Sequence, residues 1–170
     1  MKLTAFGCGR RNGNTEIYIK EALMAAEAKG IEVSYIRLGD FNIHNCSSCY
    51  QSFCPANRNI DNCKYKDDTH FLADQYLDAD GVIVGAPVYA FTPNSLFFTF
   101  RDRLFGPKMD LACENMGFPE PEWIHGRRHP RPGALISVGG AQTKHWTSLG
   151  IASLYSSTFS IGPQIVDILD

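Results

Sequence analysis

Residues 6–15 read Phe6-Gly7-Cys8-Gly9-Arg10-Arg11-Asn12-Gly13-Asn14-Thr15, and they join a short apolar strand to an amphipathic helix. The strand is predicted over residues 2–6 and the helix over residues 15–28, where apolar residues recur on one helical face. Glycines let backbone N–H groups approach an anion, and a helix N-terminus favours negative charge. This connection is therefore a candidate phosphate-binding loop at the start of an α/β fold.

The loop differs from the commonest phosphate loops. Asn12 stands where G-x-G-x-x-G has its third glycine, and the Gly-Lys-Ser/Thr of a Walker A loop is missing. Asn and Thr donors at a helix N-terminus suit one terminal phosphomonoester better than a pyrophosphate. The loop is a candidate site for the phosphate of FMN. The alternative is an ordinary turn, rich in glycine and asparagine, that caps the helix.

Size and composition indicate one globular domain over residues 1–170. The chain is 44% hydrophobic and 20% charged, and its formal charge of -2 argues against general affinity for nucleic acid. No run approaches the roughly 18 apolar residues of a membrane-spanning helix, and a strand opens the chain where a signal sequence would stand. We expect a cytoplasmic protein with no nucleic-acid or membrane partner, whose six cysteines are reduced.

Strands and helices alternate along the rest of the chain. Further strands are predicted over residues 31–38, 81–86, 134–138 and 164–169, and further helices begin near residues 67, 94 and 145. The alternation predicts an α/β fold with a doubly wound, five-stranded parallel sheet, in which the loops after strands one, three and four meet where ligands bind. The fifth strand has no helix after it, so we expect a missing terminal helix or a partner subunit to cover it.

Residues 81–86 are continuously apolar, as in a central strand covered on both faces, and a loop over residues 87–93 follows them. Asn94 is a candidate N-cap for the next helix. The spacing predicts inward-facing residues on two helices: Leu72, Tyr76 and Ala79 on the helix that begins near residue 67, and Leu96 or Phe97, Phe100 and Leu104 on the helix that begins near residue 94.

A long loop over residues 45–66 carries the motif Cys46-x2-Cys49-x4-Cys54-x8-Cys63. Four thiolates this close together can enclose one zinc ion or hold one cubane iron-sulfur cluster, and the softness of the ligands does not separate the two. Free or redox-active thiols are the third possibility.

Three more residues could bind a metal by their side-chain type, but each has a simpler interpretation. His44 is a possible substitute for one cysteine ligand, but a solvated loop histidine is the simpler interpretation. Cys8 and Cys113 lie outside the motif, and we expect them to be small buried residues.

The connection over residues 106–132 is rich in proline and charge and has no clear element of its own, which marks it as functional or disordered. It contains the basic cluster His125-Gly126-Arg127-Arg128-His129-Pro130-Arg131. A solvated surface loop explains this cluster. The functional alternative is a site for the phosphates of NADPH or for an acidic partner such as ferredoxin.

Several motifs, taken together and in this order, resemble the iron-sulfur flavoproteins of the NADPH-dependent FMN reductase superfamily. They are the loop after strand one, the four cysteines followed by Asp67-Asp68, Ala79-Asp80-Gly81, Gly85-Ala86-Pro87-Val88-Tyr89, and Arg101-Asp102-Arg103. The match is good over residues 1–104 and weaker from Gly133 onward. The resemblance implies a flavodoxin-like fold with one FMN and one 4Fe-4S cluster. It also implies a homo-oligomer, either dimer or tetramer, that transfers electrons between the two groups.

The resemblance also implies which residues hold these groups. The phosphate loop corresponds to Cys8, Arg10, Asn12, Asn14 and Thr15, with Cys8 where relatives often have serine. The segment along the isoalloxazine ring is Pro87, Val88, Tyr89 and Ala90, and the loop on its other side holds Ser137, Gly139 and Gly140. The cluster ligands are Cys46, Cys49, Cys54 and Cys63, with wider spacing than is usual in the family.

FMN exchanges a hydride or single electrons, whereas a cluster passes one electron at a time, so the pair predicts an electron-transfer oxidoreductase. Tyr89 or Phe91 is expected to stack on the flavin, and His145 and Tyr89 are candidate proton donors, with no residue assigned as catalytic. NAD(P)H is a candidate donor, and ferredoxin or another carrier a candidate partner. The alternatives are an NAD(P)H-dependent FMN or quinone reductase with structural zinc, and a non-catalytic module that senses metal or oxidant.

Overall fold

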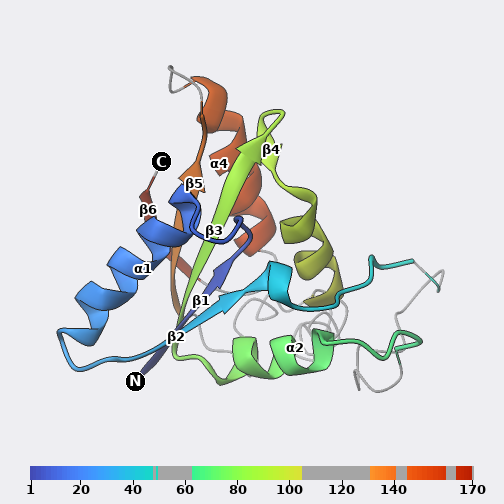
Figure 1. Ribbon diagram of the computed structural model, residues 1–170, viewed down its shortest axis with the longest axis horizontal. Helices are drawn as coiled ribbons and strands as arrows, with labels where there is room; N and C mark the ends of the chain where they lie inside the picture. The colour runs from blue at the N-terminus through green and yellow to red at the C-terminus, as the bar shows by residue number, and fades with distance from the viewer. Residues whose placement is uncertain (48, 50–62, 105–130, 141–144, 160–163, 170) are drawn as a thin grey trace, which may run out of the picture.

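The structure is a computed structural model that describes residues 1–47, 49, 63–104, 131–140, 145–159 and 164–169. Its strands are β1 (Lys2–Gly7), β2 (Glu32–Arg37), β3 (Gly81–Tyr89), β4 (Thr92–Pro93), β5 (Pro132–Val138) and β6 (Gln164–Leu169). Its helices are α1 (Asn14–Glu27), α2 (Thr69–Asp78), α4 (His145–Phe159), a helix over residues 95–104 and the 3-10 turn η1 (Leu38–Asp40) (Figure 1).

Five of the strands form one parallel sheet in the order β2-β1-β3-β5-β6, and the short β4 pairs antiparallel with β3. This order is the flavodoxin-like one: the chain adds β2 on one side of β1 and then β3, β5 and β6 on the other side, so the topological switch point lies between β1 and β3. The predicted flavodoxin-like, doubly wound parallel sheet is confirmed. None of the helices within the described ranges is long and apolar enough to cross a membrane.

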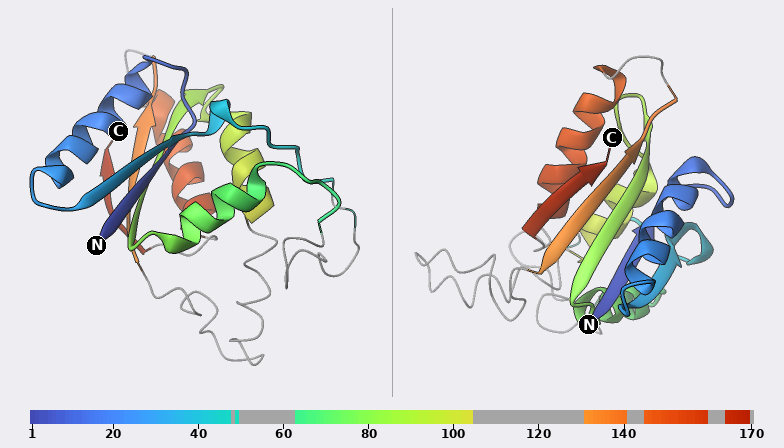
Figure 2. Two further views of the ribbon diagram at one scale, coloured as in Figure 1. Left: turned by 60° about the horizontal axis from the view of Figure 1, so that its bottom comes forward. Right: turned by 90° about the vertical axis from the view of Figure 1, so that its left-hand side faces the viewer.

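Helices cover both faces of the sheet, because side chains alternate between the faces along each strand. Phe6 and Val84 belong to the larger core cluster, which α2 and the helix over residues 95–104 complete. Ala5 and Ile83 belong to the smaller cluster under α1. Figure 2 shows α1 and α4 on opposite sides of the sheet. The central strand β3 is buried on both faces, as its continuous apolar run predicts.

The helix faces follow the predicted spacing. In α2, Leu72 and Tyr76 are fully buried. In the helix over residues 95–104, Phe97 and Phe100 are fully buried, whereas Leu96 is only partly buried and packs at the edge of the core. The rings of Phe6 and Phe100 stack with their centroids 5.0 Å apart.

The prediction of a loop over residues 87–93 was wrong in part. β3 continues to Tyr89, and a tight turn returns the chain into β4, with Tyr89 opposite Thr92. The two central residues, Ala90 and Phe91, have φ angles of 48° and 67°. Turns of this kind require positive φ at both positions and usually have Asn-Gly there, so the sequence lacked the ordinary hairpin signal. Pro87 and Pro93 also favoured the prediction of a loop, although the φ angle of proline is compatible with extended backbone.

We expect Ala90→Gly to raise the free energy of unfolding by about 0.5 to 1 kcal/mol, because a residue with a Cβ atom is strained at positive φ and glycine is not. Chemical denaturation measures the change. Ala25→Gly, at an exposed position inside α1, is the matched control and should cost about 1 kcal/mol. Equal losses in both variants would contradict the backbone argument.

Arg131 corrects one detail of the predicted basic cluster. Its side chain is buried, and Nη1 donates hydrogen bonds to the carbonyl oxygens of Tyr76 and Ala79 at 2.5 and 2.8 Å. A cation at a helix C-terminus satisfies carbonyl groups that have no partner inside the helix. Arg131 therefore caps α2, and β5 begins directly after it at Pro132. The cluster's residues 125–130 lie outside the described residues.

Candidate functional site

The carboxyl ends of β1, β3 and β5 lie at one edge of the parallel sheet (Figure 1). Gly7 at the end of β1 is paired with Gly85 of β3, which is paired with Ile136 of β5. The backbone N–H of Cys8 donates to the carbonyl oxygen of Gly85 at 2.8 Å. The ends of β1, β3 and β5 therefore lie next to one another, as the topology predicts.

Asn94 joins the segment after β4 to the loop after β1. Its Nδ2 donates to the carbonyl oxygen of Cys8 at 2.7 Å, and its Oδ1 accepts the N–H of Phe97 at 3.4 Å. The sequence predicts the second role, helix capping, but not the first, because no local pattern reports a contact across 86 residues. Asn94 thus positions the phosphate loop from the helix that follows β4.

The phosphate loop fits an anion. The N-cap of α1 is Gly13, which provides no side-chain cap, and the N–H groups of a first helical turn have no intrahelical acceptor. A Cβ atom on Gly9 would lie 2.9 Å from the Cβ atom of Thr15, so only glycine lets the loop lie against the helix. The N-terminus of α1 therefore has no side-chain cap from its N-cap residue. This geometry suits the phosphate of FMN.

The predicted residues of this loop occupy different environments. Arg10, Asn12 and Asn14 are exposed, whereas Thr15 is buried at the start of α1. Cys8 is buried in the larger core cluster, as expected, and burial raises the pKa of its thiol well above the ordinary range. Cys8 contributes to the site through its backbone hydrogen bonds, because its sulfur lies in the core.

Glu16, in the first turn of α1, contacts the loop but was not predicted from the sequence. Its side chain is almost fully buried; one oxygen pairs with Lys20 Nζ at 2.5 Å, and the other accepts the N–H of Asn12 at 2.8 Å. The hydrogen bond from Lys20 lowers the pKa of Glu16, so the carboxylate stays ionised and holds Asn12 in its left-handed conformation, with φ of 57°. A glutamate at the third helical position, as in a capping box, was the available signal.

The end of β3 and the turn after it present aromatic rings to solvent. Tyr89 is 60% exposed and Phe91 41% exposed, whereas Pro87 is buried and Val88 half-buried. Ala90, at the turn, is exposed. Either ring is therefore placed to stack on a planar ligand at this edge.

Ser137, which was predicted on the loop after the fourth strand, lies near the end of β5 and has an unsatisfied hydroxyl. Ser137 is 4% exposed, and its Oγ has no hydrogen-bond partner within the described residues. A buried hydroxyl without a partner costs about 1 to 3 kcal/mol, which a polar ligand atom would offset. Gly139 is half-buried, and Gly140 is exposed with open space around it. The buried hydroxyl of Ser137 and the open space around Gly140 therefore make the end of β5 fit a polar, planar ligand such as a flavin.

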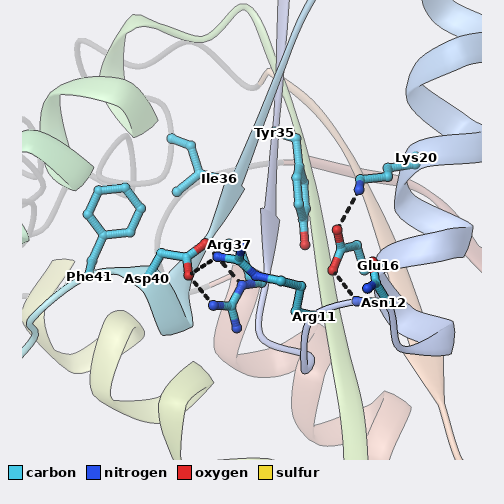
Figure 3. A pocket seen from close by; sticks show the side chains of 9 residues that line it. All are labelled: Arg11, Asn12, Glu16, Lys20, Tyr35, Ile36, Arg37, Asp40 and Phe41. Carbon is cyan, nitrogen blue, oxygen red and sulfur yellow. Dashed lines mark hydrogen bonds and ion pairs between the residues drawn. The ribbon is translucent and has the colours of Figure 1, made fainter.

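A separate pocket of about 480 Å³ lies on the other side of the phosphate loop, between α1 and the end of β2 (Figure 3). Arg11 Nη2 and Arg37 Nε bond Asp40 at 2.8 and 3.0 Å, and the bond from Arg37 lowers the pKa of Asp40. Arg11 therefore ties the loop to η1. The Tyr35 ring lines the same pocket, and burial raises its pKa to about 12.

The predicted metal ligands are described in part. Cys46 and Cys49 are exposed and Cys63 is half-buried, each as a free thiol, whereas Cys54 and Cys113 lie outside the described residues. Among the residues that the structure describes, no three His, Cys, Asp or Glu side chains gather into a metal site. The donor set of soft thiols has the chemistry that a cluster or zinc requires, and the assembly of a cluster remains a prediction.

Cys63 has a partner that the sequence analysis missed. Arg103, on the helix over residues 95–104, donates from Nη1 to Cys63 Sγ at 3.1 Å, from Nη2 to Asp67 Oδ1 at 2.9 Å and from Nε to Thr69 Oγ1 at 3.2 Å. The Arg103 and Asp67 side chains are 4% and 0% exposed. The Arg101-Asp102-Arg103 motif was the available signal, but it does not show which groups Arg103 contacts.

Asp67 organises the base of the cysteine segment. It accepts the backbone N–H groups of His44 and Thr69 at 2.9 and 3.1 Å. Burial by itself raises the pKa of Asp67, but these hydrogen bonds and the charge of Arg103 outweigh it and lower the pKa to about 2. His44 Nδ1 lies 3.1 Å from Asp67 Oδ2, and its ring stacks on Tyr65. His44 is thus half-exposed but anchored, which differs from the solvated histidine expected.

The model of the NADPH-dependent FMN reductase family matches residues 1–148. A flavone synthase of Aspergillus candidus is 29% identical over 176 residues, covering 98% of this chain and 54% of that protein. An iron-sulfur flavoprotein of Methanocaldococcus jannaschii is 29% identical over 140 residues, covering 82% of this chain and 62% of that protein. The solved structure of a flavone reductase superposes with a TM-score of 0.73 and 25% identity, covering 100% of this chain and 54% of that one.

This chain thus spans between 54% and 62% of the length of these relatives. The family match covers the phosphate loop, β3 and its hairpin, and β5, which are the elements that form the carboxyl edge of the sheet. The chain belongs to the NADPH-dependent FMN reductase family.

Proposed function

We propose that the chain is an FMN-dependent oxidoreductase that exchanges electrons between its flavin and a 4Fe-4S cluster on the cysteine segment. The observation that carries the flavin half is the uncapped N-terminus of α1, with the Gly9 loop packed on Thr15. In this proposal the N–H groups at the start of α1 bind the phosphate, the Tyr89 ring orients the flavin, and the Ser137 hydroxyl bonds a polar ligand atom. Bound FMN supplies one- and two-electron chemistry.

The cluster half rests on the four thiols and on relatives that are named iron-sulfur flavoproteins. A cluster passes single electrons, so beside a flavin it would divide the electron pair of a donor such as NAD(P)H. The likeness to a flavone reductase favours a second candidate, a flavin-dependent reductase whose thiols hold structural zinc.

We also propose a cytoplasmic homo-oligomer that meets ferredoxin or a similar carrier. Support for the oligomer comes from the edge strand β6, where Val166 is 66% and Leu169 51% exposed. Exposed apolar side chains on an edge strand are typical of an interface.

A first experiment separates these functions. Protein purified without oxygen is assayed for FMN, iron, acid-labile sulfide and zinc, together with its visible spectrum. FMN with about four irons and four sulfides per chain supports the two-centre carrier. FMN with zinc and no sulfide supports the reductase with a structural metal. Protein that retains no flavin refutes both and favours a non-catalytic sensor.

The cysteine assignment predicts that Cys49→Ser and Cys54→Ser lose iron and sulfide but keep FMN, because the phosphate loop and the cysteine segment are separate parts of the chain. Ser47→Ala, an exposed change between two of the cysteines, is the matched control and should keep both groups. Full iron in both serine variants would exclude these residues as ligands.

A further inference from the structure

We propose that Arg103 is a positioning residue for the metal centre, which fixes the Cys63 sulfur through an N–H···S hydrogen bond and raises the reduction potential of the centre. The inference rests on the proposed cluster and deepens it.

The guanidinium has little freedom. Asp67 and Thr69 bind two of its nitrogens, and the third, Nη1, is directed at Cys63 Sγ at 3.1 Å. The side chain is 4% exposed, and it lies over the ring of Tyr65, with 5.1 Å between the guanidinium carbon and the ring centroid. A planar group held by several partners keeps its direction, so the bond to sulfur is set by the fold.

The rest of the cysteine segment differs from Cys63. Cys46 and Cys49 are exposed, whereas Cys63 is joined through Arg103 to a core helix and through Asp67 to the start of α2. Among these three cysteines, Cys63 is therefore the one whose sulfur the fold already holds in position. A preorganised ligand lowers the cost of assembling the site.

The direction of the redox effect follows from charge. Reduction adds negative charge to a cluster and its sulfurs, and hydrogen bonds to those sulfurs favour the reduced state. Arg103 places a cationic N–H group, on Nη1, at one sulfur, while the Asp67 carboxylate bonds the other terminal nitrogen, Nη2. Removing the N–H group should therefore make the centre harder to reduce.

The test compares Arg103→Gln, Arg103→Lys and the double variant Arg103→Gln with Asp67→Asn. The double variant leaves no unpaired buried charge, so it replaces Arg103→Gln if the single variant does not fold. Arg101→Gln is the matched control, because it removes the same charge from the same helix at a residue that pairs with Asp102. Iron and sulfide are measured first. Redox titrations followed by electron paramagnetic resonance and visible absorbance then give the cluster and FMN midpoints on one sample.

We expect the cluster midpoint to move to more negative potential in the glutamine variants and less so in Arg103→Lys, with an unchanged FMN midpoint throughout. Arg101→Gln should match the parent protein. A parent-like cluster midpoint in the glutamine variants, or equal shifts of both midpoints, would overturn the proposal while leaving the two-centre function standing. Parent protein without sulfide would refute the proposed function, and the role of Arg103 with it.

Discussion

Asp67→Asn is expected to lower the free energy of unfolding by about 3 to 5 kcal/mol at neutral pH, because it leaves the buried Arg103 without its counter-charge. The Asp67 side chain is 0% exposed and also holds the backbone of His44 and Thr69. Urea denaturation measures the loss. Asp74→Asn, at an exposed position of α2, is the matched control and should change stability by less than about 0.5 kcal/mol. Similar losses in both variants would contradict the role assigned to Asp67.

The ionisation of the Asp67 carboxylate makes the free energy of unfolding depend on pH. The pKa of Asp67 falls from an ordinary 3.8 to about 2 in the folded protein, so its ionisation stabilises the fold above the unfolded pKa. That contribution, about 2 kcal/mol, is lost as the pH falls through the window from 3.8 to 2. The difference in stability between the parent and Asp67→Asn should therefore narrow in acid. A difference that stays constant from pH 6 to pH 2 would contradict the assigned ionisation.

Gly9→Val is expected to lower the affinity for FMN about 10- to 100-fold. Its Cβ atom would lie 2.9 Å from the Cβ atom of Thr15, so the loop must move away from the N-terminus of α1. Hydrogen bonds to a charged group contribute about 1.5 to 3 kcal/mol each, and losing one corresponds to roughly this change. Quenching of FMN fluorescence on titration with apoprotein measures the dissociation constant.

The control for this experiment is Ala25→Val, which adds the same kind of bulk at an exposed position of α1. It should leave FMN affinity unchanged. Denaturation of both variants separates a local effect from unfolding. Parent-like FMN affinity in folded Gly9→Val would refute the assignment of residues 6–15 as the phosphate loop.

Local hydrophobic patterns in the sequence predicted much of the fold. The apolar run of β3 and the helical spacing of Phe97, Phe100 and Leu104 predicted burial that the structure confirms. Prediction was wrong where local signals were weak or misleading. The hairpin after β3 turns through Ala90 and Phe91 in place of the usual Asn-Gly, and Arg131 looked like part of a basic surface cluster but caps a helix.

The sequence alone determined the order of strands and helices, the parallel sheet and the glycine-rich loop at its edge, because each depends on periodicity or chemistry within a few neighbouring residues. Only the tertiary structure decided what holds the site together. Asn94 reaches Cys8 across 86 residues, and Arg103 reaches Cys63 across 40. Such contacts arise when packed helices bring distant side chains together, and no spacing along the chain encodes them.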